Sequence, residues 1–382
     1  MRLFDEHSRD LRALQIRPRM GIYVCGITPY DSAHLGHAFT YVHFDVLVRY
    51  LRHLGAEVVH VQNVTDVDDD ILRVAKERGL DFRELAEREV ATFERAMSAI
   101  GVMPPTHSPR ATQFVSEMIQ EVEALIATGH GYERDGTVYF SVASDPGYGR
   151  LSGLTREQML PLAAERGGHP EDASKDDPLD FVLWQRSAPG EPWWESPWGR
   201  GRPGWHIECS TMARKLIGPP VDIHGGGSDL IYPHHESELA QAEGVPGGAP
   251  FVLQWVHTGT VHMSGDKMSK SLGNMAFVHD LLERHTPEAL RTYLLRRHYR
   301  QDWHFEEEDL EQESRGGARL EAGGDRADFD ATAGREAFFT ALDTDLDTPE
   351  ALRVLDRAAA SSDPAAKELI QDGMEILGLL EL

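Results

Sequence analysis

The chain of 382 residues has room for two or three domains, and its hydrophobic content of 41% is ordinary for a globular protein. No apolar run reaches membrane-spanning length, and residues 1–20 lack the apolar core of a secretory signal, so we expect a cytoplasmic protein with no membrane partner. The net charge of −25 counts against a polyanionic partner, because nucleic acids are bound largely through lysine and arginine.

The first predicted elements form a strand–helix–strand unit. Gly21–Cys25 is a short apolar run, typical of a buried parallel strand. A helical pattern follows from about His34 to His53, and Glu57–Val61 is the next predicted strand. This order places His34 and His37 at a helix N-terminus, where free amides and the helix dipole favour phosphate.

Later segments predict mainly helices, joined by polar loops. The expected elements are a helix at 112–128, a strand at 137–142, a polar loop at 167–177, a helix at 287–297 and a helix start at 348–350. Residues 314–334 hold five glycines and many charges, which predicts a mobile loop.

The two cysteines, Cys25 and Cys209, both lie in polar, glycine-flanked motifs, which indicates chemistry rather than core packing. A single disulfide would be unusual in a cytosolic protein. His234 and Glu238 share one face if they lie on a helix, and Pro233 suits its start. Two thiolates and an imidazole would suit zinc, but a His-His-Glu run is also often structural, so the residues alone leave both interpretations open.

His34-Leu35-Gly36-His37 and Lys267-Met268-Ser269-Lys270-Ser271 occur together in this order. The pair resembles the two nucleotide-handling signatures of class I aminoacyl-tRNA synthetases. The resemblance implies ATP with Mg²⁺ as a substrate and His34, His37, Lys267 and Lys270 as catalytic residues. Lys270 would neutralise the leaving pyrophosphate. The other interpretation is a surface histidine pair with an unrelated lysine–serine loop.

The segments 23–26, 204–209 and 233–236 are similar to the cysteine-activating branch of that family, which includes cysteinyl-tRNA synthetases and mycothiol cysteine ligases. The resemblance implies one Zn²⁺ per chain, bound by Cys25, Cys209 and His234, with Glu238 as an additional ligand. An open zinc position would take the substrate thiol as a thiolate and refuse serine.

The resemblance also implies a pocket for the cysteinyl adenylate. Its expected residues are Cys25, Gly26, Ile27, Thr28, Thr40, Asn63, Val64, Thr65, Trp205, Gly227, Ser228, Asp229 and Val261. Trp205 would contact the amino acid and Val261 the adenine. For Asp66, Asp68 and Asp69 we favour a helix N-cap and first-turn charge cluster over a catalytic role.

The implied fold class is α/β, with a Rossmann-like class I synthetase catalytic core, an insertion domain and a C-terminal α-helical bundle. The expected boundaries are 1–110 for the first half of the core, 111–199 for an insertion over the cleft, 200–262 for the second half, 263–310 for the lysine-motif region and 311–382 for the helical domain.

The acceptor of the activated cysteine is not fixed by these motifs. Residues 165–170, 26–31 and 274–278 resemble the mycothiol ligases, although His169 stands where aspartate is usual. After residues 348–350 the chain also leaves no room for a small terminal anticodon-binding domain. Glu238 and the segments 206–212 and 222–227 resemble the tRNA enzymes instead.

We therefore expect L-cysteine, ATP and glucosaminyl-inositol as substrates, with cysteine–tRNA ligase acting on tRNA(Cys) as the alternative. A third possibility is a non-catalytic zinc-binding relative. One basic patch is a candidate RNA contact or merely an exposed helical face; its residues are Arg291, Arg296, Arg297 and Arg300.

Overall fold

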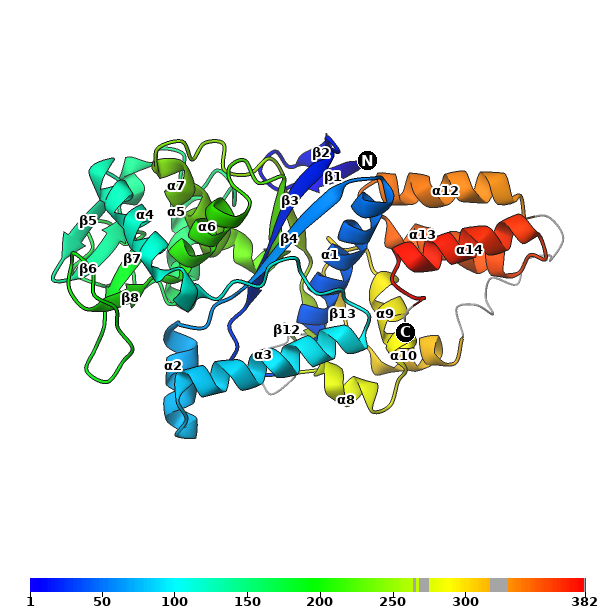
Figure 1. Cartoon of the computed structure of the whole chain (residues 1–382), viewed down its shortest axis with the longest axis horizontal. Helices are drawn as coiled ribbons and strands as arrows, with labels where there is room; N and C mark the ends of the chain where they lie inside the picture. The colour runs from blue at the N-terminus through cyan, green and yellow to red at the C-terminus, as the bar shows by residue number, and fades with distance from the viewer. Residues whose placement is uncertain (264–265, 268–274, 317–328, 381) are drawn as a thin grey trace.

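The computed structural model describes residues 1–263, 266–267, 275–316, 329–380 and 382. At its centre lies a parallel sheet with the strand order β10-β9-β3-β4 (Figure 1). The strands are β3 (Arg19–Ile27), β4 (Glu57–Val64), β9 (Ile223–Gly227) and β10 (Trp255–Thr258). The strands predicted at Gly21–Cys25 and Glu57–Val61 are confirmed as β3 and β4, and each extends beyond its predicted bounds.

Strand β3 is buried on both faces, and its side chains alternate between two hydrophobic cores. Ile22 and Val24 pack into the core that also contains α1 (Leu35–His53) and the C-terminal helices. Tyr23 and Cys25 face the other core, which is shared with the insertion. Cys25 therefore points toward the side of the sheet on which the insertion packs.

The predicted helix after β3 is confirmed as α1, and His34 is its N-cap residue. Two helices follow β4, namely α2 (Asp69–Arg78) and α3 (Phe82–Ala99). Asp68 caps α2 by accepting a 2.9 Å bond from the Ile71 amide, so the capping interpretation is confirmed there. Asp66 accepts bonds from the amide and hydroxyl of Thr112 and joins the end of β4 to the insertion.

The insertion is built around an antiparallel sheet with the order β5-β6-β7-β8. Its elements are η1 (Ala111–Gln113), α4 (Val115–Ala127), β5 (Gly131–Arg134), β6 (Thr137–Phe140), η2 (Val142–Ser144), α5 (Arg156–Glu165), β7 (Phe181–Arg186) and β8 (Gly201–Pro203). The helix and strand predicted here are confirmed, with shorter ends. Strand β8 lies beyond residue 199, so the sheet extends past the expected end of the insertion.

The second half of the core continues with α6 (Trp205–Leu216) and α7 (Glu236–Gly244), which pack against each other. A short sheet then forms from β11 (Val261–Met263), β12 (Asp266–Lys267) and β13 (Trp303–His304). An N-terminal hairpin, β1 (Arg2–Asp5) with β2 (Asp10–Ala13), lies beside β10 and was not predicted.

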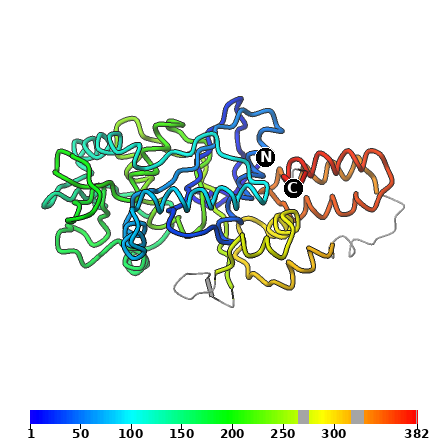
Figure 2. The backbone as a smooth tube through the Cα atoms, turned by 60° about the horizontal axis from the view of Figure 1, so that its bottom comes forward, coloured from blue at the N-terminus to red at the C-terminus, as the bar shows by residue number. Residues whose placement is uncertain are grey.

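Helices complete the chain, and those after residue 330 form the end of the molecule opposite the insertion (Figure 2). They are α8 (Val278–Leu282), α9 (Pro287–Leu295), α10 (Glu307–Ser314), α12 (Ala331–Asp343), α13 (Thr348–Ala359) and α14 (Pro364–Ile376). The helix predicted at 287–297 is confirmed as α9. Gly334 lies within α12, so the predicted loop is wrong at its C-terminal end, and its centre, 317–328, lies outside the described residues.

The four arginines of the basic patch are used inside the fold. Arg291 is fully buried and donates to the Asp45 carboxylate and to the carbonyls of Leu377 and Ile100. The other three pair with carboxylates of neighbouring elements: Arg296 with Glu313 and Asp356, Arg297 with Asp309, and Arg300 with Asp345. The expectation of an exposed basic face is therefore wrong for Arg291, and the charge of each of the others is balanced by a neighbour.

Candidate active site and metal centre

A cleft of about 1320 Å³ opens at the carboxyl ends of the central strands, between the core and the insertion. Ligands of open α/β sheets bind at this edge. Pockets for one small molecule usually measure roughly 300–1,000 Å³, so this cleft has room for more than one ligand.

His34 and His37 line this cleft at the start of α1. The His34 ring accepts a 3.3 Å bond from the His37 amide, and the two rings stack with centroids 3.6 Å apart. This reciprocal cap fixes both imidazoles at the positive end of the helix dipole. An anion such as phosphate is favoured there.

The segment after the lysine motif docks against the same turn. The Leu35 amide donates to the Ala276 carbonyl at 2.8 Å, and the Val278 amide donates to the Ala33 carbonyl at 3.0 Å. Before the motif, the backbone of Lys267 pairs with His262 in the small sheet. Lys270 lies outside the described residues, and residues 276–278 are hydrogen-bonded to the start of α1.

Cys25 lies where β3 departs from regular pairing with β4, in a register shift between Val24 and Ile27. The Gly26 amide donates to the Asn63 side chain at 2.8 Å, and a Cβ at position 26 would overlap the Asn63 carbonyl oxygen. Only glycine permits this close approach of the two strands. The irregularity places Cys25 at the floor of the cleft.

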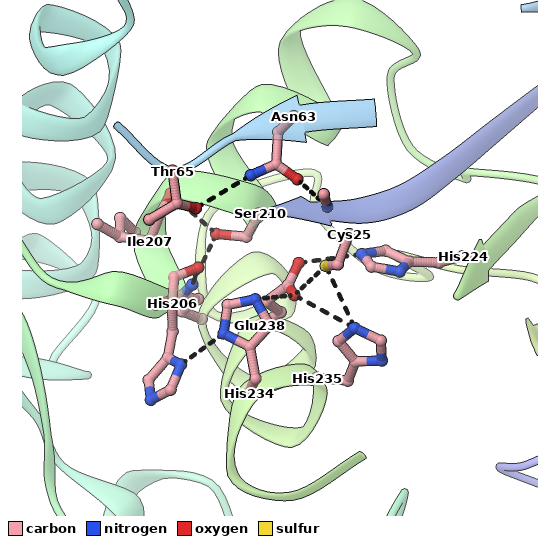
Figure 3. A network of polar contacts seen from close by, with 12 residues as sticks. Cys25, Asn63, Thr65, His206, Ile207, Ser210, His224, His234, His235 and Glu238 are labelled. Atoms are coloured by element: carbon pink, nitrogen blue, oxygen red, sulfur yellow. Dashed lines mark hydrogen bonds and ion pairs between the residues drawn. The ribbon is translucent and has the colours of Figure 1, made fainter. Parts of the chain in front are cut away.

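Four buried side chains converge beneath the cleft, and Figure 3 shows three of them, Cys25, His234 and Glu238. The ligand atoms of Cys25, Cys209, His234 and Glu238 all lie within 4.8 Å of one another. Glu238 Oε1 lies 3.4 Å from Cys25 Sγ and 3.0 Å from His234 Nε2. This set could hold a metal ion, and its two sulfurs, one imidazole and one carboxylate suit zinc.

The electrostatics of this group favour a bound cation. Burial raises the pKa of the Cys25 and Cys209 thiols and of the Glu238 carboxyl, because anions are costly away from water. Burial also lowers the pKa of His234, which keeps its imidazole neutral and able to ligate. A divalent cation among these atoms would compensate the charge of the deprotonated acids.

Further buried histidines surround the four residues. Three of them, His206, His224 and His257, were not predicted from the sequence. His206 Nδ1 lies 2.9 Å from His234 Nδ1, and His224 Nε2 lies 3.0 Å from Glu238 Oε2. His235 Nε2 lies 3.2 Å from Cys25 Sγ, while its Nδ1 lies 2.7 Å from His257 Nε2. Burial lowers the pKa of His206, His224 and His257 to about 3, so these rings are neutral hydrogen-bonding groups.

The turn that carries His234 is irregular. The backbone of Ile231–His235 is kinked at Tyr232, which is extended, with φ −132° and ψ 134°. Pro233 follows this kink, and His235 and Glu236 after it are helical, so the predicted place of Pro233 at the start of a helical segment is confirmed. His234 and Glu238 face each other, as the spacing of four residues predicts.

The structure brings most of the predicted pocket residues to the cleft. Its lining includes Cys25, Gly26, Ile27, Thr28, Asn63, Thr65, Trp205 and Asp229. The Trp205 ring stacks on His234 with centroids 4.2 Å apart. Other predicted residues are not part of that lining: Thr40, Val64, Gly227, Ser228 and Val261. Thr40 is instead buried, with its hydroxyl 2.7 Å from that of Thr258.

One wall of the cleft consists of insertion residues, of which the sequence pointed only to the segment 165–170. This wall includes Tyr139, Tyr148, Arg166, Asp172 and Lys175. Tyr139 donates to the Asp172 carboxylate at 2.8 Å, and the Lys175 ammonium donates to the Gly168 carbonyl. The wall therefore presents carboxylates, cations and hydroxyls together.

The sequence profile described as "tRNA synthetases class I (C) catalytic domain" matches residues 13–315. The chain belongs to this family. The predicted α/β synthetase fold is confirmed by this match and by a solved methionyl-tRNA synthetase from Mycobacterium tuberculosis in complex with methionyl-adenylate. That structure has a TM-score of 0.65 at 16% identity and covers 94% of this chain and 89% of its own.

Two kinds of cysteine ligase within this family are similar to the chain. An L-cysteine:1D-myo-inositol 2-amino-2-deoxy-alpha-D-glucopyranoside ligase from Thermomonospora curvata is 45% identical, over 99% of this chain and 93% of the relative. A cysteine–tRNA ligase from Geobacter sulfurreducens is 48% identical, over 79% of this chain and 62% of the relative. The prediction of an ATP-dependent, cysteine-activating class I ligase is confirmed at this level. Among the described residues, none of the helices combines the length and apolarity required to cross a bilayer.

Proposed function

We propose that this chain uses ATP to convert L-cysteine to cysteinyl-AMP and then transfers the cysteinyl group to the amine of 1D-myo-inositol 2-amino-2-deoxy-α-D-glucopyranoside, or glucosaminyl-inositol. The observation that carries the proposal is the position of the Cys25–Cys209–His234–Glu238 group. It lies at the floor of the cleft that His34 and His37 also line. A substrate cysteine whose thiol is held at that floor would direct its carboxylate toward a nucleotide at the start of α1.

In the first step, a carboxylate oxygen of cysteine attacks the α-phosphorus of ATP, and pyrophosphate leaves. The amides at the N-terminus of α1, fixed by the His34 cap, favour the phosphate charge. Trp205 forms a wall beside the amino acid, and Lys267 and Lys270 are proposed to neutralise pyrophosphate. A zinc ion held by the four-residue group would supply a Lewis-acidic position for the substrate thiolate.

In the second step, the acceptor amine attacks the cysteinyl carbonyl carbon, AMP leaves and the amine loses a proton. The insertion wall supports a small polyhydroxylated amine, because carboxylates such as Asp172 suit an ammonium or a diol. The alignment with the Thermomonospora curvata ligase over 99% of this chain supports the same acceptor. The net charge of −25 and the carboxylate partners of the helix α9 arginines weigh against tRNA.

A second acceptor, tRNA(Cys), is favoured by one observation. Glu238 completes the buried group with an oxygen 3.0 Å from His234, and the resemblance noted from the sequence associates this carboxylate with the tRNA enzymes. We further propose that ATP acts together with Mg²⁺, that the protein is cytoplasmic, and that its domains have the expected boundaries, with the insertion extended to the end of β8.

The test is a pair of assays on the purified chain. Labelled pyrophosphate should exchange into ATP with cysteine and not with serine. The cysteine-loaded enzyme should then form AMP and an amide with glucosaminyl-inositol, and leave tRNA(Cys) uncharged. Equal exchange with serine would contradict selection by a thiol-binding site, and efficient charging of tRNA with no amide product would establish the second acceptor.

A further inference from the structure

Arg166 connects the insertion to the turn that carries His234. It is the C-cap residue of α5, it lines the cleft, and its Nη1 donates to the Tyr232 carbonyl at 2.6 Å. Among the described residues, no carboxylate forms an ion pair with Arg166, and its guanidinium binds the Tyr232 carbonyl instead. An arginine with such a placement is not explained by charge balance on the surface.

The Tyr232 carbonyl accepts a hydrogen bond from outside its own turn. The Glu236 amide donates to the carbonyls of Ile231 and Pro233 and passes over Tyr232, whose backbone is extended. Tyr232 is also buried, so without Arg166 its carbonyl would lose its hydrogen bond. Pro233 cannot help, because proline has no amide hydrogen to donate.

We propose that Arg166 is a positioning residue for His234. By holding the Tyr232 carbonyl, Arg166 fixes the irregular turn two residues before the imidazole. It thereby sets how tightly the Cys25–Cys209–His234–Glu238 group holds a divalent metal. The inference rests on the metal part of the proposed function and does not depend on the acceptor.

Three further hydrogen bonds indicate that the loss of Arg166 would act on the geometry of the turn rather than on folding. Tyr148 of the insertion lies 3.1 Å from the Ser237 hydroxyl, and the amides of Leu151 and Ser152 donate to the Glu236 carboxylate. These bonds hold the insertion against α7 independently of Arg166. The single bond to Tyr232 then controls only the turn that precedes α7.

The experiment measures metal binding with no cysteine, ATP or acceptor present. Zinc affinity is obtained by competition with a chelator, and Co²⁺ replaces zinc so that visible absorption reports ligand geometry. Arg166→Met should bind zinc about 10-fold more weakly, the lower end of what loss of a partner behind a metal ligand usually costs, and should shift the Co²⁺ bands. Arg166→Lys, which keeps one donor on a shorter reach, should fall between Met and wild type.

The matched control is Arg156→Met, at the other end of α5, where the arginine is exposed and pairs with Asp177. It should bind zinc and Co²⁺ as the wild type does. Wild-type affinity and an unchanged spectrum in Arg166→Met would overturn the proposal. If Arg166→Met loses helical content by circular dichroism, Arg166→Lys decides, and wild-type affinity in that variant would overturn it. A wild-type chain that binds no zinc would instead refute the metal part of the proposed function.

Discussion

Replacing Arg291 by methionine should destabilise the junction between the catalytic core and the C-terminal helices. Arg291 lies on α9 and is fully buried, and its three bonds reach three different elements. Methionine has an unbranched side chain similar to the aliphatic part of arginine, but it cannot donate a hydrogen bond. The carbonyls of Leu377 and Ile100 would then lose donors now at 2.7 and 3.0 Å.

The expected loss is about 3 kcal/mol of unfolding free energy. A buried acceptor left without its donor costs about 1–3 kcal/mol, and two carbonyls are affected. Breaking a buried ion pair by removing one partner typically costs about 3–5 kcal/mol. Asp45 moderates the second effect, because its carboxylate keeps a 2.9 Å bond from Arg49 and a bond from the Met103 amide. The ion-pair cost is therefore largely avoided, and the two carbonyls, at about 1.5 kcal/mol each, account for the expected loss.

The assay is urea unfolding followed by circular dichroism, combined with hydrogen exchange, because a multidomain chain need not unfold in one step. Exchange should accelerate first at the end of α14, next to Leu377. The control is Arg353→Met on α13, an exposed arginine paired with Glu350, which should change stability by less than about 0.5 kcal/mol. Equal stability and equal exchange in Arg291→Met and Arg353→Met would refute the role given to Arg291.

Cys209→Ser should lose bound metal and cysteine activation together, measured as zinc per chain beside pyrophosphate exchange; full metal retention would show that the ligands are wrongly assigned. Lys270→Ala should slow adenylate formation in single turnovers far more than it weakens cysteine binding, because the Lys270 ammonium is needed where pyrophosphate leaves. A change confined to cysteine affinity would contradict this role. Burial lowers the pKa of His43 from 6.5 to about 4, so between these values the unfolded chain binds a proton that the folded chain refuses. The stabilisation by the neutral His43 is thus complete above pH 6.5 and is lost as the pH falls through 4, by up to about 3 kcal/mol of unfolding free energy. The unfolding free energy of His43→Gln should therefore vary less with pH over this range. An identical slope in the variant and the wild type would exclude this linkage.

The parts of the fold that follow from local patterns were predictable. The apolar run of β3, the capped start of α1 at His34 and the helix at α9 each depend on neighbours in the sequence. The proposed metal ligands were assigned as one set only through resemblance, because Cys25 and Glu238 are 213 residues apart and no local pattern joins them.

What the sequence did not predict depends on distant partners. Arg291 looked like a surface cation because its partner Asp45 lies on another helix, 246 residues earlier. His206, His224 and His257 stand in unrelated segments, and only the fold gathers their rings behind the ligands. The extended conformation of Tyr232 is different, because Pro233 disfavours helical backbone at the residue before it.

The division of the central sheet between two distant parts of the chain has a consequence during synthesis on the ribosome. Strands β3 and β4 leave the exit tunnel early, but β9, which pairs with the other edge of β3, follows only at Ile223–Gly227. Until then the inner edge of β3 is an unpaired strand edge next to Cys25, open to aggregation. Contacts across so long a separation form slowly, which extends this interval. A metal bound by Cys25 and Glu238 would join the two parts only near the end of this process, so a shortage of that metal would act on newly made chains more than on finished ones.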